Sequence, residues 1–567
     1  MSSLVSKEIK GHSYYYIVDS KRINGKPRHV NQIYLGPVQD VIQQLKENKG
    51  AVSPLYSQSL DFGAAVALYD LAERLNLVAL INRIAGKRQQ GVSVGHYLLL
   101  AALNRALAPT SKSKLADWYE QTMLSRLIPC AKQQLSSQRF WDHMHYWTQE
   151  KMDQFEASFT RQLVEQYQLT TRCVVYDATN FFTFIDTTNQ QASVAQRGHC
   201  KQKRTDLRII GLSLLVSSDE EIPLFYEVYE GNKPDSKQFA DVVDTLRKRY
   251  AQIFGQEADI TLVFDRGNNA QSNLDLLMQQ EKPFHCIGGL KLTQCKQLLS
   301  IPKSQYRKLN GSEFGETSVF RTQMHVYGRN MTIVATHNPE LLRGQLQGIL
   351  IGREKCRDAL TALQERLQKW ENGENTRGKA PDLKSCQKNV AAILKGQYMK
   401  MLFDIVWSEA GRYPSFTFRT PEKALLDLEE SILGKTFLFT DQHTWSDEQI
   451  VHAYRSAWHI EHVFRQMKDP VHLTVRPMWH WTNPMIRVHI FCCVLAYRLC
   501  GILQKELKQH GFDLSMNDLL DKLGQSKQLI HYYQRKRGLS ETYSMTIGSE
   551  ETEKIVRLLD LQRYKLS

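Results

Sequence analysis

Two aspartates follow strand-like apolar runs in the central part of the sequence. Asp177 closes the run CVVYD, and Asp265 closes the run TLVFD. Both runs are short and rich in β-branched and aromatic residues, which predicts buried strands. Strand ends on one edge of an α/β sheet are where such folds build their sites. Taken alone, each aspartate is more simply explained as a residue that opens a turn after a strand. The two together indicate a functional site only if a third residue joins them.

Glu461 is the candidate for that partner, and it lies in a predicted helix that begins near Ser446. Ser446 and Gln449 have the spacing of a capping box, which marks the helix start. Further along, Tyr454, Glu461 and Lys468 recur at every seventh position, so they lie on one helix face within roughly 20° per step. An apolar stripe beside them places Glu461 at the border of the buried face. The stripe is formed by Ala457, Ile460, Phe464 and Met467.

A carboxylate at that border needs compensation, because a desolvated charge either finds a partner or becomes neutral. A salt bridge from Glu461 to Arg465, four residues further along the helix, is one solution. The other is a site in which Glu461 joins Asp177 and Asp265 around bound cations. Without cations, each pair of carboxylates would repel by about 4 kcal/mol at about 4 Å and an effective dielectric constant of about 20. Oxygen ligands without a nearby cysteine favour Mg²⁺ or Mn²⁺ over zinc.

The composition fits a large globular protein with a polyanionic partner. The chain has 567 residues, more than one hydrophobic core usually organises, so we expect about three or four structural units. Lys and Arg number 73 against 59 Asp and Glu, and the net charge of +14 makes nucleic acid the first candidate partner.

Ten cysteines without a C-x-x-C pair indicate neither a zinc knuckle nor a disulfide framework, which suits a reducing cytoplasm. The most apolar run, IFCCVLAY, is too short to cross a bilayer and predicts a buried helix.

The order of the predicted elements indicates an α/β protein. Residues 12–35 predict a β-hairpin with its turn at Asn24-Gly25, and residues 60–167 show helical spacing. This helical region could bind a DNA duplex through its basic residues, or it could be a helical bundle without a role in DNA binding. The basic residues are Arg105, Lys112, Lys114 and Arg139. Three strands, a helix and a fourth strand follow after Thr171, and the end beyond Gln504 is predicted to be helical.

These elements predict six regions along the chain. They are a hairpin region (1–50), a helical DNA-binding domain (51–168), a first core segment (169–290), an insertion domain (291–434), a second core segment with the Glu461 helix (435–504), and a C-terminal helical region (505–567).

Several motifs together resemble the DDE transposases of bacterial insertion sequences. They are YDAT at Asp177, FDRG at Asp265, and the Y-x6-E-x6-K set at Tyr454, Glu461 and Lys468. The sequence is most similar to the insertion-sequence-four superfamily and its sixteen-thirty-four branch. Further matches are YYYIVDSKRINGKPRHVNQIYLG, PLFYEVYEGNKPD and RPMWHWTNPMIRVHIF, so the resemblance covers most of the chain. The long interval between Asp265 and Glu461 has room for the inserted domain of this superfamily.

The resemblance implies an RNase H-like catalytic core in which Asp177, Asp265 and Glu461 are the catalytic residues and hold two Mg²⁺ ions, for which Mn²⁺ can substitute. One ion would activate a water or a terminal 3′-hydroxyl, and the other would stabilise the leaving 3′-oxygen. A strand is first nicked at the end of the element, and the freed 3′-hydroxyl then attacks target DNA.

The resemblance also implies contacts with DNA phosphates. Tyr454, Lys468 and Arg465 would hold the phosphate next to the cleavage point, which positions the DNA without reading its sequence. One departure is that the superfamily usually has an arginine three positions after the tyrosine, where this sequence has Ala457. Arg455 or Arg465 could supply the charge instead, although Arg455 points away by helix geometry, so the residue that takes this role stays open. The alternative for these residues is a solvated helix face.

Other DNA-binding candidates lie outside this helix. Arg266 belongs to the FDRG motif, and a basic patch made of Lys201, Lys203, Arg204 and Arg208 could track the DNA backbone or form a solvated loop. Four tryptophans could stack on an extruded base or belong to the core: Trp445, Trp458, Trp479 and Trp481. His480 and His489 are expected to pair inside a helical core and not to bind metal.

The implied partner is double-stranded DNA, both transposon ends and target. A homodimer is expected because symmetric ends call for a two-fold protein, and the C-terminal helices are candidates for its interface. We expect no membrane association and a cytoplasmic, nucleoid-associated location in a prokaryote. Two other functions stay open, a catalytically inactive DNA-binding protein of transposon descent and a structure-selective nuclease on the same fold.

Overall fold

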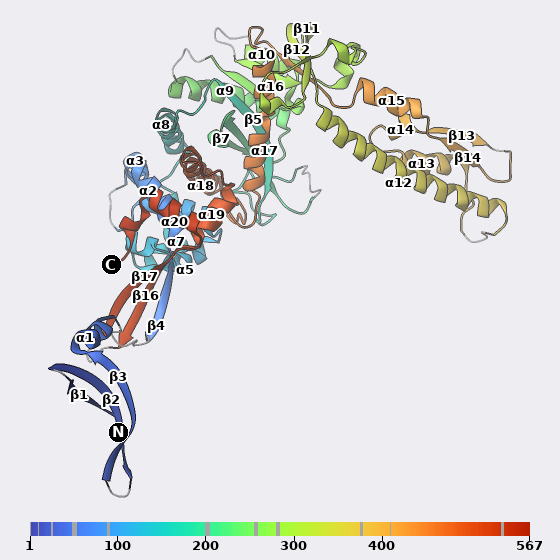
Figure 1. Cartoon of the computed structure of the whole chain (residues 1–567). Helices are drawn as coiled ribbons and strands as arrows, with labels where there is room; N and C mark the ends of the chain where they lie inside the picture. Colours follow the sequence, from blue (N-terminus) through green and yellow to red (C-terminus); the bar gives the residue numbers. More distant parts are fainter. Residues whose placement is uncertain are drawn as a thin grey trace. The chain divides into compact units, whose positions relative to one another are not determined.

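The computed structural model describes most of the chain (Figure 1). The described residues are 2–9, 11–23, 26–47, 54–87, 91–198, 204–254, 259–278, 284–374, 378–408, 410–534 and 538–567. The chain divides into two compact units, and each is described by itself. The first unit comprises Met1–Ala67, Tyr119–Pro129 and Asp518–Ser567, and the second comprises Leu68–Trp118 and Cys130–Asn517.

A nine-stranded mixed sheet forms the centre of the second unit, in the order β10-β11-β12-β15-β9-β8-β5-β6-β7. β8 runs parallel to both β5 and β9, and the other neighbouring pairs are antiparallel. The strands are β5 (Cys173–Phe182), β6 (Ile209–Ser217), β7 (Pro223–Glu230), β8 (Thr261–Phe264), β9 (His285–Gly289), β10 (Arg307–Lys308), β11 (Ser318–Val326), β12 (Arg329–His337) and β15 (Lys435–Thr440). The predicted α/β class is therefore confirmed at the level of a mixed α/β protein with one large mixed sheet.

Helices cover both faces of this sheet, which explains why β6 and β8 are buried along their whole length. Helix α9 (Asp235–Phe254) packs on one face, where the Phe239 ring meets Tyr176 at 5.1 Å and Phe264 at 5.2 Å between centroids. Helix α17 (Ala457–Gln466) contacts β5 and β6. Side chains alternate along a strand, so Asp177 projects from the face opposite to Tyr176.

Helices dominate the rest of the second unit. They include α3 (Leu77–Ala85), α4 (Val94–Leu107), α7 (Ser137–Met144), α8 (Gln149–Tyr167), α10 (Gln271–Met278), α11 (Lys296–Leu299) and α18 (Asn483–Gln509). In the described part of the chain, α18 is the one helix long and apolar enough to cross a membrane, but 94% of its most apolar window is buried inside the structure. The apolar run IFCCVLAY is thus the core helix that the sequence predicts.

The predicted insertion differs from the structure at its first boundary. Strands β10, β11 and β12 fall inside residues 291–434 but belong to the large sheet. The separately packed segment begins after them with α12 (Pro339–Glu371) and has its own hydrophobic core, from Ile349 to Leu433. It also contains α13 (Leu383–Ile393), α14 (Met399–Leu402), α15 (Glu422–Ser431) and the hairpin of β13 (Asp404–Ser408) and β14 (Ser415–Arg419).

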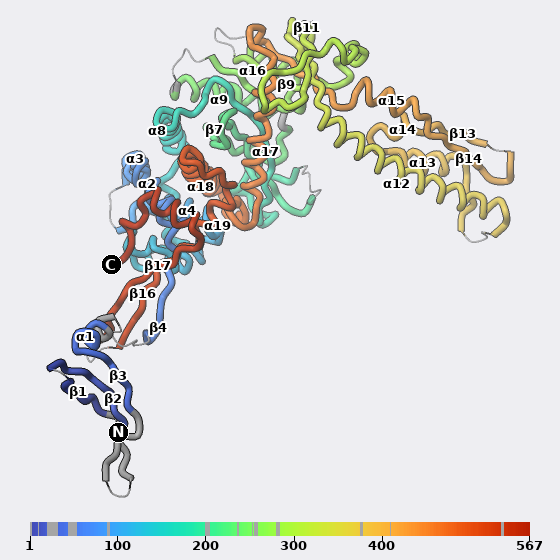
Figure 2. The backbone as a smooth tube through the Cα atoms, in the orientation of Figure 1, coloured from blue at the N-terminus to red at the C-terminus, as the bar shows by residue number. Residues whose placement is uncertain are grey.

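The first unit contains two small sheets (Figure 2). In one, β2 (His12–Ile23) pairs with β1 (Ser2–Ile9) and β3 (Lys26–Pro37), which confirms the predicted hairpin, although Asn24 and Gly25 lie outside the described residues. In the other, β16 (Lys527–Gln534) pairs with β4 (Tyr56–Asp61) and β17 (Leu539–Thr546). The prediction of an all-helical C-terminal region is therefore wrong for this part.

The remaining helices are short or cross the division between the units. Helices α1 (Val38–Glu47), α6 (Leu124–Leu127) and α20 (Glu550–Leu558) belong to the first unit, and α2 (Gly63–Arg74), α5 (Leu115–Glu120) and α19 (Met516–Gly524) cross the division. The predicted helical region between residues 60 and 167 is thus confirmed by helices from α2 to α8.

Candidate active site

Asp177 and Asp265 lie side by side on neighbouring parallel strands. Tyr176 of β5 pairs with Phe264 of β8, so the next residue of each strand, an aspartate, comes at the same level of the sheet. Neighbouring strands are about 4.8 Å apart, which brings the two carboxylates within reach of a common ligand. One expectation needs correction, because β5 does not end at Asp177 but continues to Phe182 alongside β6. It is β8 that ends here, at Phe264.

Local hydrogen bonds restrain both aspartates. Asp265 is exposed and caps a short 3-10 turn, η3 (Arg266–Asn268), where its Oδ1 accepts a hydrogen bond from the Arg266 amide at 2.7 Å. Asp177 is half-buried, and its Oδ1 accepts a hydrogen bond from the Ala178 amide at 2.8 Å. Each carboxylate is thus oriented by the backbone of the residue that follows it.

The predicted helix after Ser446 is interrupted. Ser446 caps α16 (Asp447–Arg455) and forms the predicted capping box with Gln449, with hydrogen bonds of 3.2 and 2.9 Å. The chain then breaks at the buried Ser456, whose hydroxyl donates to the Ala453 carbonyl at 2.6 Å, and α17 follows. Lys468 lies beyond the last residue of α17. The expectation of one continuous helix that aligns Tyr454, Glu461 and Lys468 is therefore wrong.

Glu461 is exposed on α17, not at the border of its buried face. The buried side of α17, with Ile460, Val463 and Phe464, packs toward β5 and β6. Arg465 is also exposed, and among the residues that the structure describes the Glu461 carboxylate forms no hydrogen bond or ion pair with it or with any other side chain. The salt bridge that was the alternative explanation of Glu461 is therefore not formed.

Two histidines fix the rotation of α17. His462 Nδ1 bonds to the Glu221 carboxylate, and His459 Nδ1 lies 3.8 Å from the other oxygen of that group. Tyr497 of α18 donates a hydrogen bond to the same carboxylate at 3.4 Å. Because these partners lie on one side of α17, they hold Glu461 toward solvent.

Tyr454 of α16 interacts electrostatically with both Asp265 and Glu461. Burial raises its pKa above 10.0, and the nearby carboxylates of Asp265 and Glu461 add to the rise, whereas a hydrogen bond with Arg266 opposes it. Tyr454 thus lies within electrostatic reach of both carboxylates. Arg266, predicted only as a DNA-binding residue, brings a guanidinium to the same place.

Gly289 makes this arrangement possible. A Cβ atom placed on Gly289 would lie 2.6 Å from the Tyr454 hydroxyl and 2.9 Å from Arg266 Nε. Gly289 ends β9, the strand next to β8, and a bare backbone lets both side chains come close. Sequence reasoning missed this residue, although the pair Gly288-Gly289 inside a strand-like run was a usable signal.

Lys468 reaches the face of the sheet from which Asp177 projects. Its Nζ donates a hydrogen bond to Thr179 Oγ1 at 2.5 Å and lies 5.4 Å from the centre of the Phe181 ring. Thr179 and Phe181 share the face of Asp177, because side chains two residues apart point the same way along a strand. Lys468 therefore brings a positive charge close to Asp177. Thr179 was not predicted, because only the folded chain brings Lys468 to it.

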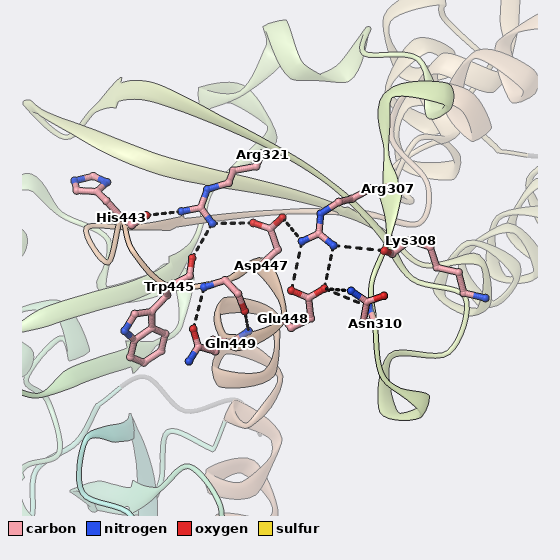
Figure 3. Close-up of polar contacts among 10 residues, drawn as sticks. Arg307, Lys308, Asn310, Arg321, His443, Trp445, Asp447, Glu448 and Gln449 are labelled. Carbon is pink, nitrogen blue, oxygen red and sulfur yellow. Dashed lines mark hydrogen bonds and ion pairs between the residues drawn. The ribbon is translucent and has the colours of Figure 1, made fainter.

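Two arginines from β10 and β11 hold the start of α16 (Figure 3). Asp447 is almost completely buried and accepts hydrogen bonds from Arg307 at 2.7 Å and from Arg321 at 2.9 Å. Arg307 also pairs with Glu448 at 2.9 Å, and it lowers the pKa of that carboxyl group to about 2. We call these four residues, Arg307, Arg321, Asp447 and Glu448, the α16 clamp. Sequence reasoning missed the clamp because it assigned both arginines to an insertion.

The clamp also involves one predicted DNA-binding residue. The Trp445 carbonyl accepts a hydrogen bond from Arg321 at 2.8 Å, and the Trp445 side chain is half-buried beside the capping box (Figure 3). Arg455, at the other end of α16, donates to Thr317 Oγ1 at 2.7 Å and is therefore engaged away from the aspartates, as helix geometry predicts.

The basic patch after β5 is only partly described. Lys201 and Lys203 lie outside the described residues. Arg204 is paired with Asp206 through contacts of 2.6 and 2.5 Å, and Arg208 donates to the Asn189 carbonyl at 2.8 Å. The described part of this patch thus contains arginines that already have protein partners.

Cations of the helical region differ in exposure. Arg105 is 1% exposed and donates a hydrogen bond to the Thr110 carbonyl. The prediction that Arg105 contacts a DNA duplex is therefore wrong. Lys114 and Arg139 are exposed and Lys112 is half-buried. His489 is buried and donates a hydrogen bond to the Val475 carbonyl at 2.7 Å, which confirms a core histidine.

The donor set of the three predicted ligands suits a hard divalent cation, because it consists of carboxylate oxygens alone. In the part of the chain that is described, no three His, Cys, Asp or Glu side chains lie close enough together to hold a metal ion. Asp177 and Asp265 are adjacent, and Glu461 is exposed on α17. The convergence of all three around cations therefore stays a prediction.

One family model matches more than half of the chain. The family model described as "Transposase DDE domain" matches residues 170–478, and no curated protein matches the chain. Among solved structures, the piggyBac transposase synaptic complex with hairpin DNA is 10% identical, with a TM-score of 0.33 over 81% of this chain and 78% of that chain. The Mos1 transposase paired-end complex with the left transposon end is 10% identical, with a TM-score of 0.14 over 34% and 57%. The Mos1 mariner paired end complex with Mn is 11% identical, with a TM-score of 0.15 over 35% and 60%.

Proposed function

The chain belongs to the family of transposases with a DDE domain, and from this premise we propose that it cuts the ends of an insertion sequence and joins them to target DNA by a cut-and-paste route. We further propose an RNase H-like core and membership of the insertion-sequence-four superfamily, in its sixteen-thirty-four branch. The observation that carries the proposal is the register of β5 and β8, which sets Asp177 beside Asp265 within the matched region.

Asp177, Asp265 and Glu461 would hold two Mg²⁺ ions, for which Mn²⁺ can substitute. When bound, the ions lower the barrier to phosphoryl transfer by activating the attacking oxygen and stabilising the leaving 3′-oxygen. The aspartates supply a preformed pair of ligands at the end of β8. Glu461, exposed and without a partner in the described residues, completes the set once cations offset the repulsion between carboxylates.

Three neighbouring residues would hold the scissile phosphate. Lys468 contributes a positive charge on the Asp177 face of β5, and Arg266 contributes another beside Asp265. Arg266 can thus supply the charge that the superfamily places where this chain has Ala457. Tyr454 holds Arg266 and can donate its hydroxyl proton to a phosphate oxygen, since its raised pKa keeps it protonated at neutral pH. Arg465 and Trp445 are proposed to contact the flanking DNA.

The reaction would proceed in two substitutions at phosphorus. Water attacks the phosphodiester at the transposon end, a P–O bond forms, and the bond to the 3′-oxygen breaks. The freed 3′-hydroxyl then attacks a phosphodiester of target DNA and displaces its 3′-oxygen. A homodimer would hold both ends, in the cytoplasm at the nucleoid of a prokaryotic cell.

A cleavage assay tests this function. Linear DNA with candidate element ends is incubated with the full chain in Mg²⁺ or EDTA, and strand cleavage and end binding are measured in parallel. We expect Mg²⁺-dependent cuts at the ends only. Asp177→Asn and Glu461→Gln should reduce cleavage by at least about a thousandfold and leave end binding within about threefold. Asp358→Asn, an exposed carboxylate on α12, is the matched control and should cut normally.

Other outcomes of this assay point to the alternative functions. Binding without cleavage by the unmodified chain would indicate an inactive DNA-binding protein of transposon descent. Cuts governed by junction shape and not by the ends would indicate a structure-selective nuclease. Normal cleavage by Asp177→Asn or Glu461→Gln would refute the proposed site.

A further inference from the structure

Strand β7 is the last strand of the large sheet, and in the described part of the chain it pairs only with β6. Two cavities open along its outer edge, with volumes of about 360 and 560 Å³. Both are lined by Glu227 and Val228 of β7 and by Arg487 of α18, so they adjoin each other. The first cavity also reaches α8, and the second reaches the start of α9. We call the two cavities together the β7 groove.

The outer edge of β7 presents backbone groups without partners. The Thr183 amide donates to the Arg208 carbonyl at 2.9 Å, so this carbonyl points toward β5. Backbone groups alternate in direction along a strand, and Glu227 pairs with the fifth residue after Arg208, so Glu227 bonds to β6. The N–H and C=O groups of Tyr226 and Val228 therefore point outward, where no described residue bonds to them.

The chain itself continues the pairing where β7 ends. The Gly231 amide donates to the Val194 carbonyl at 3.1 Å, and Asn483 Oδ1 accepts a hydrogen bond from the Val194 amide at 3.1 Å. Open N–H and C=O groups on an edge strand are a template for a further strand, and they are costly in an enclosed place unless they are bonded. The part of the edge at Tyr226 and Val228 thus has room and bonding capacity for another backbone.

The charges of the β7 groove are balanced. Its lining has four cations, Arg249, Arg487, Lys233 and Lys237, and four carboxylates, Asp153, Glu227, Glu230 and Asp241. A groove that binds DNA needs an excess of cations, because contacts with phosphates supply most of the affinity. Balanced charge beside both N–H donors and C=O acceptors instead fits a polypeptide.

Arg487 is the cation best placed to select that polypeptide. It is half-buried, lines both cavities, and donates one hydrogen bond of 3.4 Å to Gln149 Oε1. Arg249, by contrast, is paired with Asp153. Arg487 forms no ion pair with any described residue, so its guanidinium can bind a carboxylate through two N–H groups.

We propose that the β7 groove binds an extended segment of a partner protein as an additional strand of the large sheet. The backbone of the segment bonds to the outward groups of Tyr226 and Val228, which supplies affinity. An acidic side chain near the middle of the segment pairs with Arg487, which supplies specificity. The site uses none of the three predicted metal ligands and needs no DNA, so it does not depend on the proposed function.

Peptide selection on the full chain tests this site. The probe is a phage library that displays random seven-residue peptides. We expect enriched peptides with an acidic residue near the middle, and their synthetic forms should bind Val228→Pro and Arg487→Gln at least about tenfold more weakly than the unmodified chain. Proline removes the outward N–H of Val228, leaves the bonds to β6, and is tolerated on edge strands. Lys400→Gln, an exposed residue of α14, is the control and should bind normally.

Methylation of the peptide backbone tests the mode of binding. N-methylation of every second residue of a selected peptide removes the N–H groups along one edge of the extended peptide. We expect one of the two alternating patterns to lower the affinity at least about tenfold and the other to change it by less than about threefold. Equal effects of both patterns would refute the added strand, as would the lack of any enriched peptide whose binding depends on Val228 and Arg487.

Other occupants of the groove give different results. Displacement of the selected peptides by a single-stranded oligonucleotide would indicate nucleic acid, and a change of oligomeric state in Val228→Pro without peptide would indicate a second copy of the chain. Either result would contradict the proposal. Thermal melting shows whether Val228→Pro is folded, and Arg487→Gln with the methylated peptides provides the test if it is not. Peptide binding is measured without DNA, so its failure and a failure of end cleavage are separate results.

Discussion

Gly289 lies close to two side chains of the candidate site. Its neighbours are the Tyr454 hydroxyl and Arg266 Nε, at 2.6 and 2.9 Å from the position of a Cβ atom. Heavy atoms at these distances overlap, so any side chain on Gly289 must push Tyr454 or Arg266 away. Both residues adjoin Asp265, and catalytic constellations are sensitive to displacements of about 1 Å.

We therefore expect Gly289→Ala to lower the cleavage rate by at least about tenfold while the fold persists. Adding Tyr454→Phe removes the hydroxyl that clashes, so the double variant should cut faster than Gly289→Ala alone. Single-turnover cleavage rates of the two variants and of Tyr454→Phe provide the comparison. Unchanged cleavage by Gly289→Ala would show that Tyr454 and Arg266 are not held in place at this strand.

At the scale of elements, the α16 clamp determines where Tyr454 and the following helix lie. Asp447 and Glu448 occupy the first turn of α16, where negative charge is favourable, and Arg307 and Arg321 bind them from the sheet. Because α17 follows after a single residue, the position of Glu461 depends on this attachment.

The clamp predicts a pH dependence of stability. Arg307 lowers the pKa of Glu448 from 4.5 to about 2, so the ionised group stabilises the fold above about pH 4.5 and this contribution is lost as the pH falls toward 2. We expect Arg307→Gln to lower the melting temperature at pH 5 and the difference from the unmodified chain to shrink between pH 4.5 and 2. Lys308→Gln, which removes an exposed pair with Glu316, is the control and should change little at any of these pH values. A difference that stays constant down to pH 2 would contradict this role of Glu448.

At the scale of the second unit, a buried ion pair joins elements that are far apart in the sequence. Arg498 of α18 binds Glu156 of α8 through two contacts of 2.9 and 2.7 Å, and its Nε donates to the Pro223 carbonyl of β7 at 2.7 Å. The two side chains are 1% and 5% exposed. The pair thus fixes two helices against one edge strand of the large sheet.

Removal of one partner leaves a buried charge without compensation. We expect Glu156→Gln to destabilise the protein by about 3–5 kcal/mol. Replacing both residues by Met should restore most of that loss, because an apolar pair of similar volume needs no compensation. Thermal and urea unfolding of the single and double variants measures both effects. A single variant as stable as the unmodified chain would show that the pair does not join these elements.

The sequence predicted the parts of this molecule that depend on local patterns. The apolar runs before Asp177 and Asp265, the capping box at Ser446 and the buried α18 all follow from short-range signals. The interruption at Ser456 was missed because residues on both sides keep a helical pattern. β16 was missed because its mixed polar and aromatic residues have neither a long apolar run nor strict alternation, and its partner β4 lies in a distant segment. The α16 clamp and the contact of Lys468 with Thr179 depend on tertiary pairing, which no local signal reports.

The most direct test of the account counts divalent ions bound by the full chain with a DNA end. Electron paramagnetic resonance of Mn²⁺ can follow this binding without relying on cleavage. We expect about two Mn²⁺ ions per chain, and weaker or lost binding of at least one ion in Asp177→Asn, Asp265→Asn and Glu461→Gln. If the chain binds no Mn²⁺, or if Glu461→Gln binds the same number with the same affinity, the three carboxylates do not form the proposed metal site.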